Sequence, residues 1–242
     1  MLKIENVTKR FGGIVAVDDV SFTLEHNKIL GLVGPNGSGK TTLFNCISGL
    51  SPATAGRILL NGRDITGFKP HRICKLGIGR TFQLVKPFRS LTALENVILG
   101  LKFGHPKKIN NILQEAHSLL DFVGLSPKAA AISGQLILAE RKKLEIARAL
   151  ATKPSVLLLD EVASGLTESE TQEIISLIRK INQSGLTILI VEHVMPVVMS
   201  LSERIVVLSE GKKIAEGSPD LIAADHRVIE VYLGERIKSA VI

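Results

Sequence analysis

The sequence predicts an α/β fold in which a parallel sheet is covered by helices. Four short apolar runs have the length and continuity of strands that are buried on both faces, and they occupy residues 29–33, 156–159, 188–191 and 205–208. Helical periodicity appears between these runs, because apolar residues recur on one face in residues 112–123 and again in residues 171–182. Strands that alternate with helices along a chain form a sheet with helices packed against it.

The opening and the middle of the chain depart from this alternation. Apolar residues occur in short runs at 14–17 and then at Val20, Phe22 and Leu24, a pattern typical of an antiparallel flank. Residues 87–151 contain no convincing strand, and residues 100–108 are interpreted as a loop that leads into helices. We therefore expect a single domain over residues 1–242, with an α/β core from 1–86 and 152–242 and an inserted helical subdomain, 87–151.

Composition excludes several classes of protein. The 242 residues are 45% hydrophobic and 22% charged, which suits one sizeable core and excludes a disordered chain, a coiled coil and a fibrous protein. No apolar run approaches the roughly 18 residues of a membrane-spanning helix. Cys46 and Cys74 match neither metal-ligand spacing nor a disulfide framework, so we expect a reducing, cytosolic compartment. The formal charge of +7 is compatible with nucleotide phosphates, nucleic acid or an anionic membrane surface and selects none of them.

The strongest motif follows the first apolar run and fits the pattern G-x-x-x-x-G-K-[ST]. We call residues 34–42 the glycine loop; it consists of Gly34, Pro35, Asn36, Gly37, Ser38, Gly39, Lys40, Thr41 and Thr42. A helical segment, residues 41–50, comes next. Glycines let successive backbone N–H groups point at a polyphosphate, and the following helix adds its positive N-terminus.

These residue types predict a nucleotide phosphate site. Lys40 would bridge the β- and γ-phosphates, and the hydroxyl of Thr41 would ligate Mg²⁺. A chance match to the motif in a chain of this length is on the order of one in a hundred, and the strand before it and the helix after it lower that figure.

A second element is expected to supply the magnesium carboxylate and to handle the attacking water. The apolar run at 156–159 ends in two adjacent acids, Asp160 and Glu161. We expect Asp160 to hold Mg²⁺, directly or through water, and Glu161 to polarise the water. The alternative is a pair of solvated acids at the end of a strand.

With these motifs, the sequence resembles the ATP-binding-cassette (ABC) ATPase subunits of transporters over nearly its whole length. The resemblance implies a P-loop NTPase (RecA-like) core with the antiparallel flank and the inserted helical subdomain. It also implies that Gln83, in the string RTFQ at 80–83, contacts both Mg²⁺ and the water and links the core to the helical subdomain. His193 is similar to the switch histidine that contacts the γ-phosphate. Phe11 occupies the place of an aromatic residue that stacks on adenine, and a core phenylalanine at a strand end is the alternative.

The signature segment is where the chain departs from the family, which has Leu-Ser-Gly-Gly-Gln before a basic helix. Counted back from that helix, the aligned residues are Leu136, Ile137, Leu138, Ala139 and Glu140, so the serine and both glycines are missing. Ser133-Gly134-Gln135, just upstream, is the alternative register. Two further departures are Val162, where the family has proline, and Thr167, where its subunit-contacting loop has Asp or Asn.

Within the family, three strings are similar to subunits of branched-chain amino-acid importers: KRFGG at 9–13, RTFQ at 80–83, and IAEGSP at 214–219 running on to VYLG at 231–234. The resemblance implies an ATPase that uses ATP and Mg²⁺ and pairs head-to-tail with a second ABC ATPase subunit, identical or different. It also implies transmembrane permease subunits, indirectly a solute-binding protein, and a peripheral position on the cytoplasmic face of the cell membrane.

Other functions remain open. A soluble ABC ATPase that acts on nucleic acid or the ribosome is allowed by the charge. Such proteins carry a second cassette, a coiled coil or a zinc insertion, none of which the sequence shows, so we expect no nucleic-acid partner. An importer ATPase for another substrate is possible because other subunits select the substrate. The degenerate signature also allows an ATP-binding partner with little activity, whereas a GTPase is disfavoured because no Asn-Lys-x-Asp motif is present.

Overall fold

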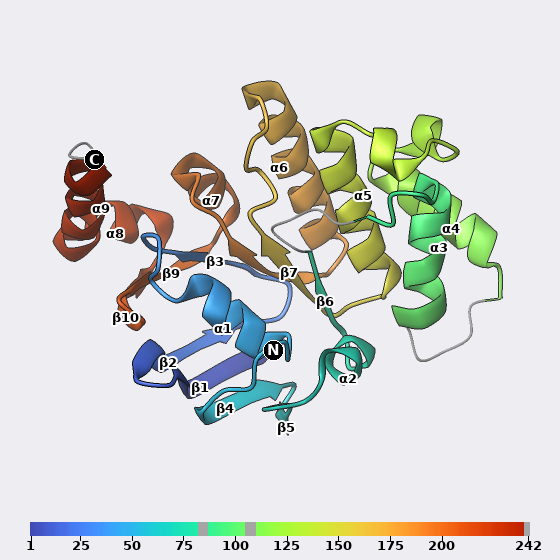
Figure 1. The fold of residues 1–242 in the computed structure, drawn as a ribbon. Coiled ribbons are helices and arrows are strands. Elements are labelled where there is room, and N and C mark those ends of the chain that lie inside the picture. The colour runs from blue at the N-terminus through green and yellow to red at the C-terminus, as the bar shows by residue number, and fades with distance from the viewer. Residues whose placement is uncertain (82–86, 105–109, 240–242) are drawn as a thin grey trace.

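The computed structural model describes residues 1–81, 87–104 and 110–239, and in it the chain forms two sheets with α1 (Lys40–Ile47) between them (Figure 1). One sheet has six strands in the order β10-β9-β3-β8-β7-β6, and the other has four in the order β2-β1-β4-β5. Leu43, Phe44 and Ile47 of α1 are fully buried in the apolar cluster that the two sheets share. The helix that follows the glycine loop is therefore anchored on both sides.

The six-stranded sheet confirms the expected α/β class. Its strands are β3 (Ile29–Val33), β6 (Ile78–Arg80), β7 (Val156–Asp160), β8 (Thr187–Val191), β9 (Arg204–Ser209) and β10 (Lys212–Gly217). All neighbours are parallel except β10, which is antiparallel to β9. Each predicted apolar run lies in one of these strands. The sequence did not reveal β6, because it is only three residues long and contains a glycine and an arginine.

The four-stranded sheet is the predicted antiparallel flank. It consists of β1 (Leu2–Phe11), β2 (Ile14–Leu24), β4 (Ala55–Leu60) and β5 (Arg63–Asp64). Alternate residues of β1 and β2 point inward, so Leu2, Ile4, Phe22 and Leu24 are buried in the cluster that surrounds α1.

The helical segments other than α1 lie around the two sheets. They are α2 (Pro70–Lys75), α3 (Ala93–Gly104), α4 (Ile112–Phe122), η1 (Ser126–Lys128), η2 (Ser133–Gln135), α5 (Leu138–Ala151), α6 (Glu168–Gln183), α7 (Met195–Leu201), α8 (Pro219–Ala224) and α9 (His226–Ser239). Both segments with predicted helical periodicity form helices, α4 and α6. Helix α1 ends at Ile47, earlier than expected, and Gly49 follows it with a φ of +75°. No helix in the described ranges is both long and apolar enough to span a membrane.

The expectation of a loop over residues 100–108 is wrong for its first part, because α3 continues to Gly104. Leu101 is buried on the same face as Val97, one turn earlier. A Cβ added at Gly100 would lie 2.8 Å from Cβ of Ala151 in α5. Gly100 therefore permits close packing of two helices and does not interrupt α3. Residues 105–109 lie outside the described ranges.

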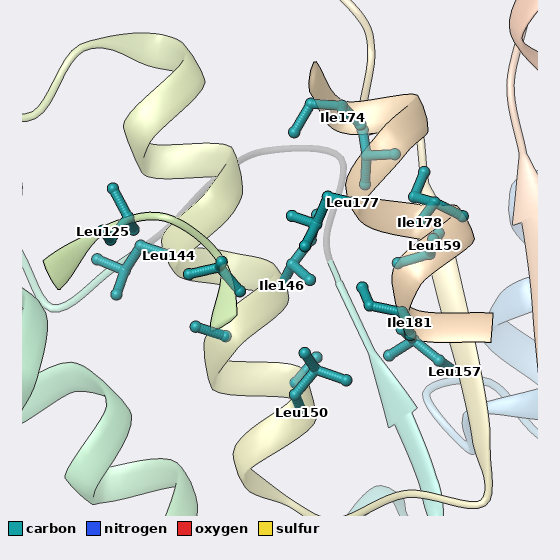
Figure 2. Packing of buried hydrophobic residues seen from close by; sticks show 14 of the residues in the cluster. Leu125, Leu144, Ile146, Leu150, Leu157, Leu159, Ile174, Leu177, Ile178 and Ile181 are labelled. Carbon is teal, nitrogen blue, oxygen red and sulfur yellow. The ribbon is translucent and has the colours of Figure 1, made fainter. Parts of the chain in front are cut away.

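Helix α5 joins the helices of the 87–151 stretch to the six-stranded sheet. Figure 2 shows Ile146 and Leu150 of α5 on the side that faces β7 and α6, and Leu125 beside Leu144. These residues belong to one buried cluster that also contains Leu157 of β7. A displacement of α5 therefore cannot occur without repacking against the strand that ends in Asp160.

Candidate active site

The glycine loop is tightly packed against neighbouring strands at two of its glycines and open at the third. Gly34, Gly37 and Gly39 have φ values of +149°, +77° and +100°, a region that side chains with a Cβ rarely adopt. A Cβ at Gly34 would lie 2.1 Å from the carbonyl oxygen of Leu208, and one at Gly39 would lie 2.4 Å from that of Ala16. A Cβ at Gly37 would meet nothing within 4 Å, so this part of the loop faces open space.

Lys40 is the first residue of α1, and its side chain folds back beneath the glycine loop. Its Nζ donates hydrogen bonds of 2.7 Å to the carbonyl oxygens of both Gly34 and Pro35, and one of 3.3 Å to Oγ of Ser38. Lys40 is only 8% exposed. The first turn of α1 contains no acidic residue, so a buried ammonium and a helix N-terminus lie together and favour an anion.

Asp160 ends β7 and is almost completely buried, with 2% of its surface exposed. Its Oδ2 accepts a 2.9 Å hydrogen bond from Nη2 of Arg80, and its backbone N–H donates to Oγ1 of Thr81. Its Oδ1 is buried and has no hydrogen-bond partner among the described residues. Burial raises the pKa of the Asp160 carboxyl, and the hydrogen bond from Arg80 opposes that rise. One carboxylate oxygen is thus held by protein while the other is left for a ligand.

Arg80 is a site residue that our sequence analysis did not single out. In addition to its bond with Asp160, its Nη1 donates to Oδ1 of Asn45 at 2.8 Å and to Oγ of Ser48 at 2.7 Å. Arg80 therefore connects β6, β7 and α1. The only available signal was its place in the string RTFQ, because its partners lie 32 to 80 residues away in the chain.

Glu161 and His193 lie beside each other because they follow neighbouring parallel strands. Asp160 of β7 pairs with Val191 of β8, so the residues just beyond those strands emerge at the same edge of the sheet. Oε1 of Glu161 lies 3.8 Å from Nδ1 of His193. Glu161 has a φ of +49°, and a residue other than glycine in this region costs on the order of 1–3 kcal/mol. The strained turn directs Glu161 away from the path of the strand.

The signature segment spans the start of α5. Ile137 immediately precedes the helix, is 59% exposed, and donates its backbone N–H to Oε2 of Glu140 at 3.1 Å. Leu136 and Ala139 are buried, and Leu138 is the first residue of the helix. Ile137 therefore occupies the N-cap position of α5, but its side chain has no oxygen that could accept a hydrogen bond from the first turn of the helix.

The alternative register, Ser133-Gly134-Gln135, forms the separate short helix η2. Ser133 is fully buried, and its hydroxyl donates to the carbonyl oxygen of Phe88 at 2.9 Å. The amide of Asn96, also fully buried, donates to the same hydroxyl. The hydroxyl of Ser133 is thus used in buried hydrogen bonds to Phe88 and to Asn96 of α3. This favours the register that begins at Leu136.

Phe11 and Gln83 complete the expected set. Phe11 ends β1 and is 52% exposed, with Nζ of Lys9 at 4.7 Å from its ring centroid. The alternative interpretation of Phe11 as a core residue is wrong, because its side chain is about half exposed at the end of β1. Gln83 falls in residues 82–86, outside the described ranges.

Comparison with known proteins identifies the family. A family model described as ABC transporter matches residues 17–164, and one described as branched-chain amino acid ATP-binding cassette transporter matches residues 212–238. The chain is 38% identical to the high-affinity branched-chain amino acid transport ATP-binding protein BraF of Pseudomonas aeruginosa, over 97% of this chain and 98% of BraF. It is also 38% identical to the corresponding protein LivG of Escherichia coli, over 97% and 98%. The methionine import ATP-binding protein MetN of Rhizobium johnstonii is 40% identical, over 90% of this chain but 60% of MetN.

Solved structures agree with this assignment. A nucleotide-free ATP-binding cassette from an ABC transporter superposes with a TM-score of 0.89 at 32% identity, covering 96% of this chain and 98% of the other. A dimeric cassette in a post-hydrolysis state, bound to ADP and Pi, superposes with a TM-score of 0.82 at 30% identity, covering 90% and 99%. The chain therefore belongs to the ABC transporter family, as an ATP-binding cassette with ATPase activity.

Proposed function

We propose that this chain hydrolyses ATP to power a membrane importer of branched-chain amino acids or a related small polar solute. The observation that carries the chemistry is that Lys40, at the start of α1, lies near the adjacent acids Asp160 and Glu161 at the end of β7. Lys40 is close enough to act electrostatically on the Asp160 carboxyl, although the two residues are far apart in the chain. The substrate class rests on the similarity to BraF and LivG and on the family match at residues 212–238.

ATP is assigned to the glycine loop and the start of α1. The phosphates would take the place of the carbonyl oxygens that Lys40 now contacts, because a phosphate oxygen is a stronger acceptor for an ammonium. The backbone N–H groups of residues 34–42, except Pro35, which has none, would donate hydrogen bonds to the phosphates. The exposed ring of Phe11 would stack on adenine. Phe11 lies near the glycine loop because β1 pairs with β2, and the carbonyl oxygen of Ala16 in β2 lies against Gly39.

Magnesium suits the residues around Asp160. The buried Oδ1 without a partner among the described residues is the type of ligand that Mg²⁺ prefers. We assign Thr41, Asp160 and Gln83 as the protein groups that would hold the ion. When bound with ATP, Mg²⁺ neutralises charge on the phosphate oxygens during transfer.

Glu161 and His193 are assigned to the reaction itself. Glu161 would accept the proton of the attacking water, a contribution typically worth roughly 10²–10⁴ in rate. His193 would donate to the γ-phosphate, and its position 3.8 Å from Glu161 would place both groups around one water. Lys40 then stabilises the negative charge that develops on the transferred group.

The signature segment is assigned to the ATP of a second cassette. Two subunits, identical or different, would pair head-to-tail so that the start of α5 in one faces the phosphates bound by the other. Ile137 is exposed there, but it cannot supply the hydroxyl that the family uses. Backbone N–H groups at the start of α5 remain available to the phosphates.

A cavity of about 620 Å³ supports a permease as the next partner. It lies between α2 and β6 on one side and α3 and α5 on the other, and it is lined by Phe88, Phe103 and Arg80. Phe88 and Phe103 are more than half exposed, and an aromatic cleft of this kind suits an inserted helix. Docking there would place the chain on the cytoplasmic face of the membrane and connect it indirectly to a solute-binding protein.

Uptake measurements test the substrate class. Deleting the gene for this chain is expected to abolish ATP-dependent uptake of labelled leucine, and restoring the wild-type gene is expected to recover it. Restoration with the Lys40→Met variant is the matched control and should not recover uptake. Loss of methionine uptake with unchanged leucine uptake would contradict the proposal and assign the chain to a methionine importer.

A further inference from the structure

Two buried charged residues, Lys142 and Glu192, hold the turn that carries Glu161. Lys142 lies in α5 and is 5% exposed, and its Nζ donates a 2.7 Å hydrogen bond to the carbonyl oxygen of Glu161. Glu192 follows β8 and is fully buried, and its Oε1 accepts a 2.7 Å hydrogen bond from the backbone N–H of Ala163. The backbone of residues 161–163 is thus gripped near both ends by charged side chains.

The energetics of burial argue that these charges are not present for stability. Burial lowers the pKa of the Lys142 ammonium, and the nearby carboxylates of Glu192, Glu145 and Glu161 oppose that change. Burial likewise raises the pKa of the Glu192 carboxyl, whose Oε2 has no hydrogen-bond partner among the described residues. Replacing buried charges with packed apolar side chains is often neutral or stabilising, so their presence at this turn calls for another reason.

The strained backbone of Glu161 supplies that reason. A non-glycine residue with a φ of +49° persists only where its surroundings enforce it. The N–H of Glu161 is held by the carbonyl oxygen of Val191 at 2.9 Å, and its carbonyl oxygen is held by Lys142. Without Lys142, the carbonyl oxygen of Glu161 loses its charged partner and keeps only the long 3.4 Å hydrogen bond from the N–H of Ser164. The peptide that follows Glu161 can then rotate more easily, which would move the carboxylate away from His193.

We propose that Lys142 and Glu192 are positioning residues that hold the 161–163 turn so that the Glu161 carboxylate faces the attacking water. This inference rests on the proposed function, in which Glu161 is the base. Lys142 lies about one helical turn from Leu138, where α5 begins. The same helix therefore presents the signature segment to a second cassette and, through Lys142, positions the general base Glu161 of its own site.

The test compares Lys142→Met with Lys143→Met. Lys143 is the next residue of α5, but its Nζ bonds to Glu173 instead, whose side chain is 60% exposed. In the purified protein, Lys142→Met is expected to lower kcat about 10- to 100-fold, because displacing a catalytic group by about 1 Å can reduce the rate by that factor. The KM for ATP and the calorimetric Kd for MgATP are expected to stay within twofold. Lys143→Met should match the wild type in all three, and Lys142→Arg should recover most of the lost kcat.

A double variant shows whether Lys142 acts through Glu161. Combining Lys142→Met with Glu161→Gln should lower kcat no further than Glu161→Gln alone, since two changes to one functional unit are not additive. Glu192→Gln retains an acceptor for the Ala163 N–H and should lower kcat less than Glu192→Leu. If Lys142→Met does not fold, Lys142→Gln carries the same expectation, because its shorter side chain cannot reach the carbonyl oxygen of Glu161.

Three results would overturn the inference: wild-type kcat in Lys142→Met, a parallel loss of kcat and MgATP affinity, or an additive loss in the double variant. Each of these leaves the proposed function intact as long as Glu161→Gln itself is inactive. Full turnover in Glu161→Gln would instead contradict the proposed function.

Discussion

Arg80 and Asp160 form a buried ion pair at the base of the site, with Nη2 2.9 Å from Oδ2 and side chains that are 8% and 1% exposed. The pair orients the one carboxylate that we assign to Mg²⁺ and leaves its Oδ1 open. Because Arg80 also contacts Asn45 of α1 and Ser48, which follows that helix, it holds the helix behind the glycine loop and the end of β7 in one arrangement.

Arg80→Leu is expected to lower the free energy of unfolding by about 3–5 kcal/mol, because it leaves a buried carboxylate without its counterion. Urea unfolding of the nucleotide-free protein measures this. Arg57→Leu is the matched control: Arg57 pairs with Glu5 at a similar distance, 2.8 Å, but its side chain is 65% exposed, so its removal should have a much smaller effect. An equal decrease in the free energy of unfolding of the two variants would show that the buried ion pair of Arg80 contributes no more to stability than the exposed pair of Arg57.

Lys40→Met is expected to weaken MgATP binding roughly 10- to 150-fold, the equivalent of one hydrogen bond between charged groups at about 1.5–3 kcal/mol. Titration calorimetry on the purified protein measures the Kd. Lys143→Met, a change of the same type in α5 at a lysine that is paired with Glu173, should leave the Kd unchanged. An unaltered Kd in Lys40→Met would remove the glycine loop from nucleotide binding.

Glu161→Gln is expected to keep the wild-type Kd for MgATP and to lower hydrolysis by roughly 10²–10⁴, because the amide cannot accept the proton of water. Sedimentation should show dimers that persist in ATP, since the bound nucleotide is no longer consumed. Glu168→Gln, on the exposed first turn of α6, serves as the control with unchanged turnover. Rapid hydrolysis by the Glu161 variant would require a different base.

Ile137→Ser is expected to raise ATP hydrolysis in a homodimer, because it restores a hydroxyl at the start of α5. The same serine can cap α5 and should raise the free energy of unfolding by about 1 kcal/mol. Leu113→Ser, at a position that is 55% exposed on α4, controls for the loss of an exposed apolar side chain and should not change hydrolysis. Unchanged hydrolysis in Ile137→Ser, in a preparation shown to be homodimeric, would mean that this segment does not face ATP.

Local patterns in the sequence were sufficient for the framework of the site. The apolar runs at 29–33 and 156–159 predicted β3 and β7 because strands buried on both faces require uninterrupted apolar side chains. The glycine loop was recognisable because its backbone conformation restricts which residues are allowed, and Gly34, Gly37 and Gly39 all have positive φ values. Asp160 and Glu161 were recognisable from their place at the end of such a run.

The errors and omissions arose where a residue's role depends on a distant neighbour. Gly100 has a sequence context typical of a loop, yet it lies inside α3 because Ala151 of α5 packs against it. Phe11 fitted either a core residue at a strand end or an aromatic residue that stacks on adenine, and only its exposure at the end of β1 excluded the core interpretation. Lys142 and Arg80 could not be distinguished by sequence from the many solvated cations of the chain.

The sequence by itself determined which apolar runs become the central strands, where a phosphate-binding backbone lies, and which acids and histidine lie at the ends of those strands. Each of these depends on residues that are adjacent in the chain. Only the tertiary structure decided that Arg80 holds Asp160 and that Lys142 holds the carbonyl oxygen of Glu161. Those contacts join residues 80 and 19 positions apart, and a buried charge acquires its role from whichever group the packing of helices and sheet brings to it.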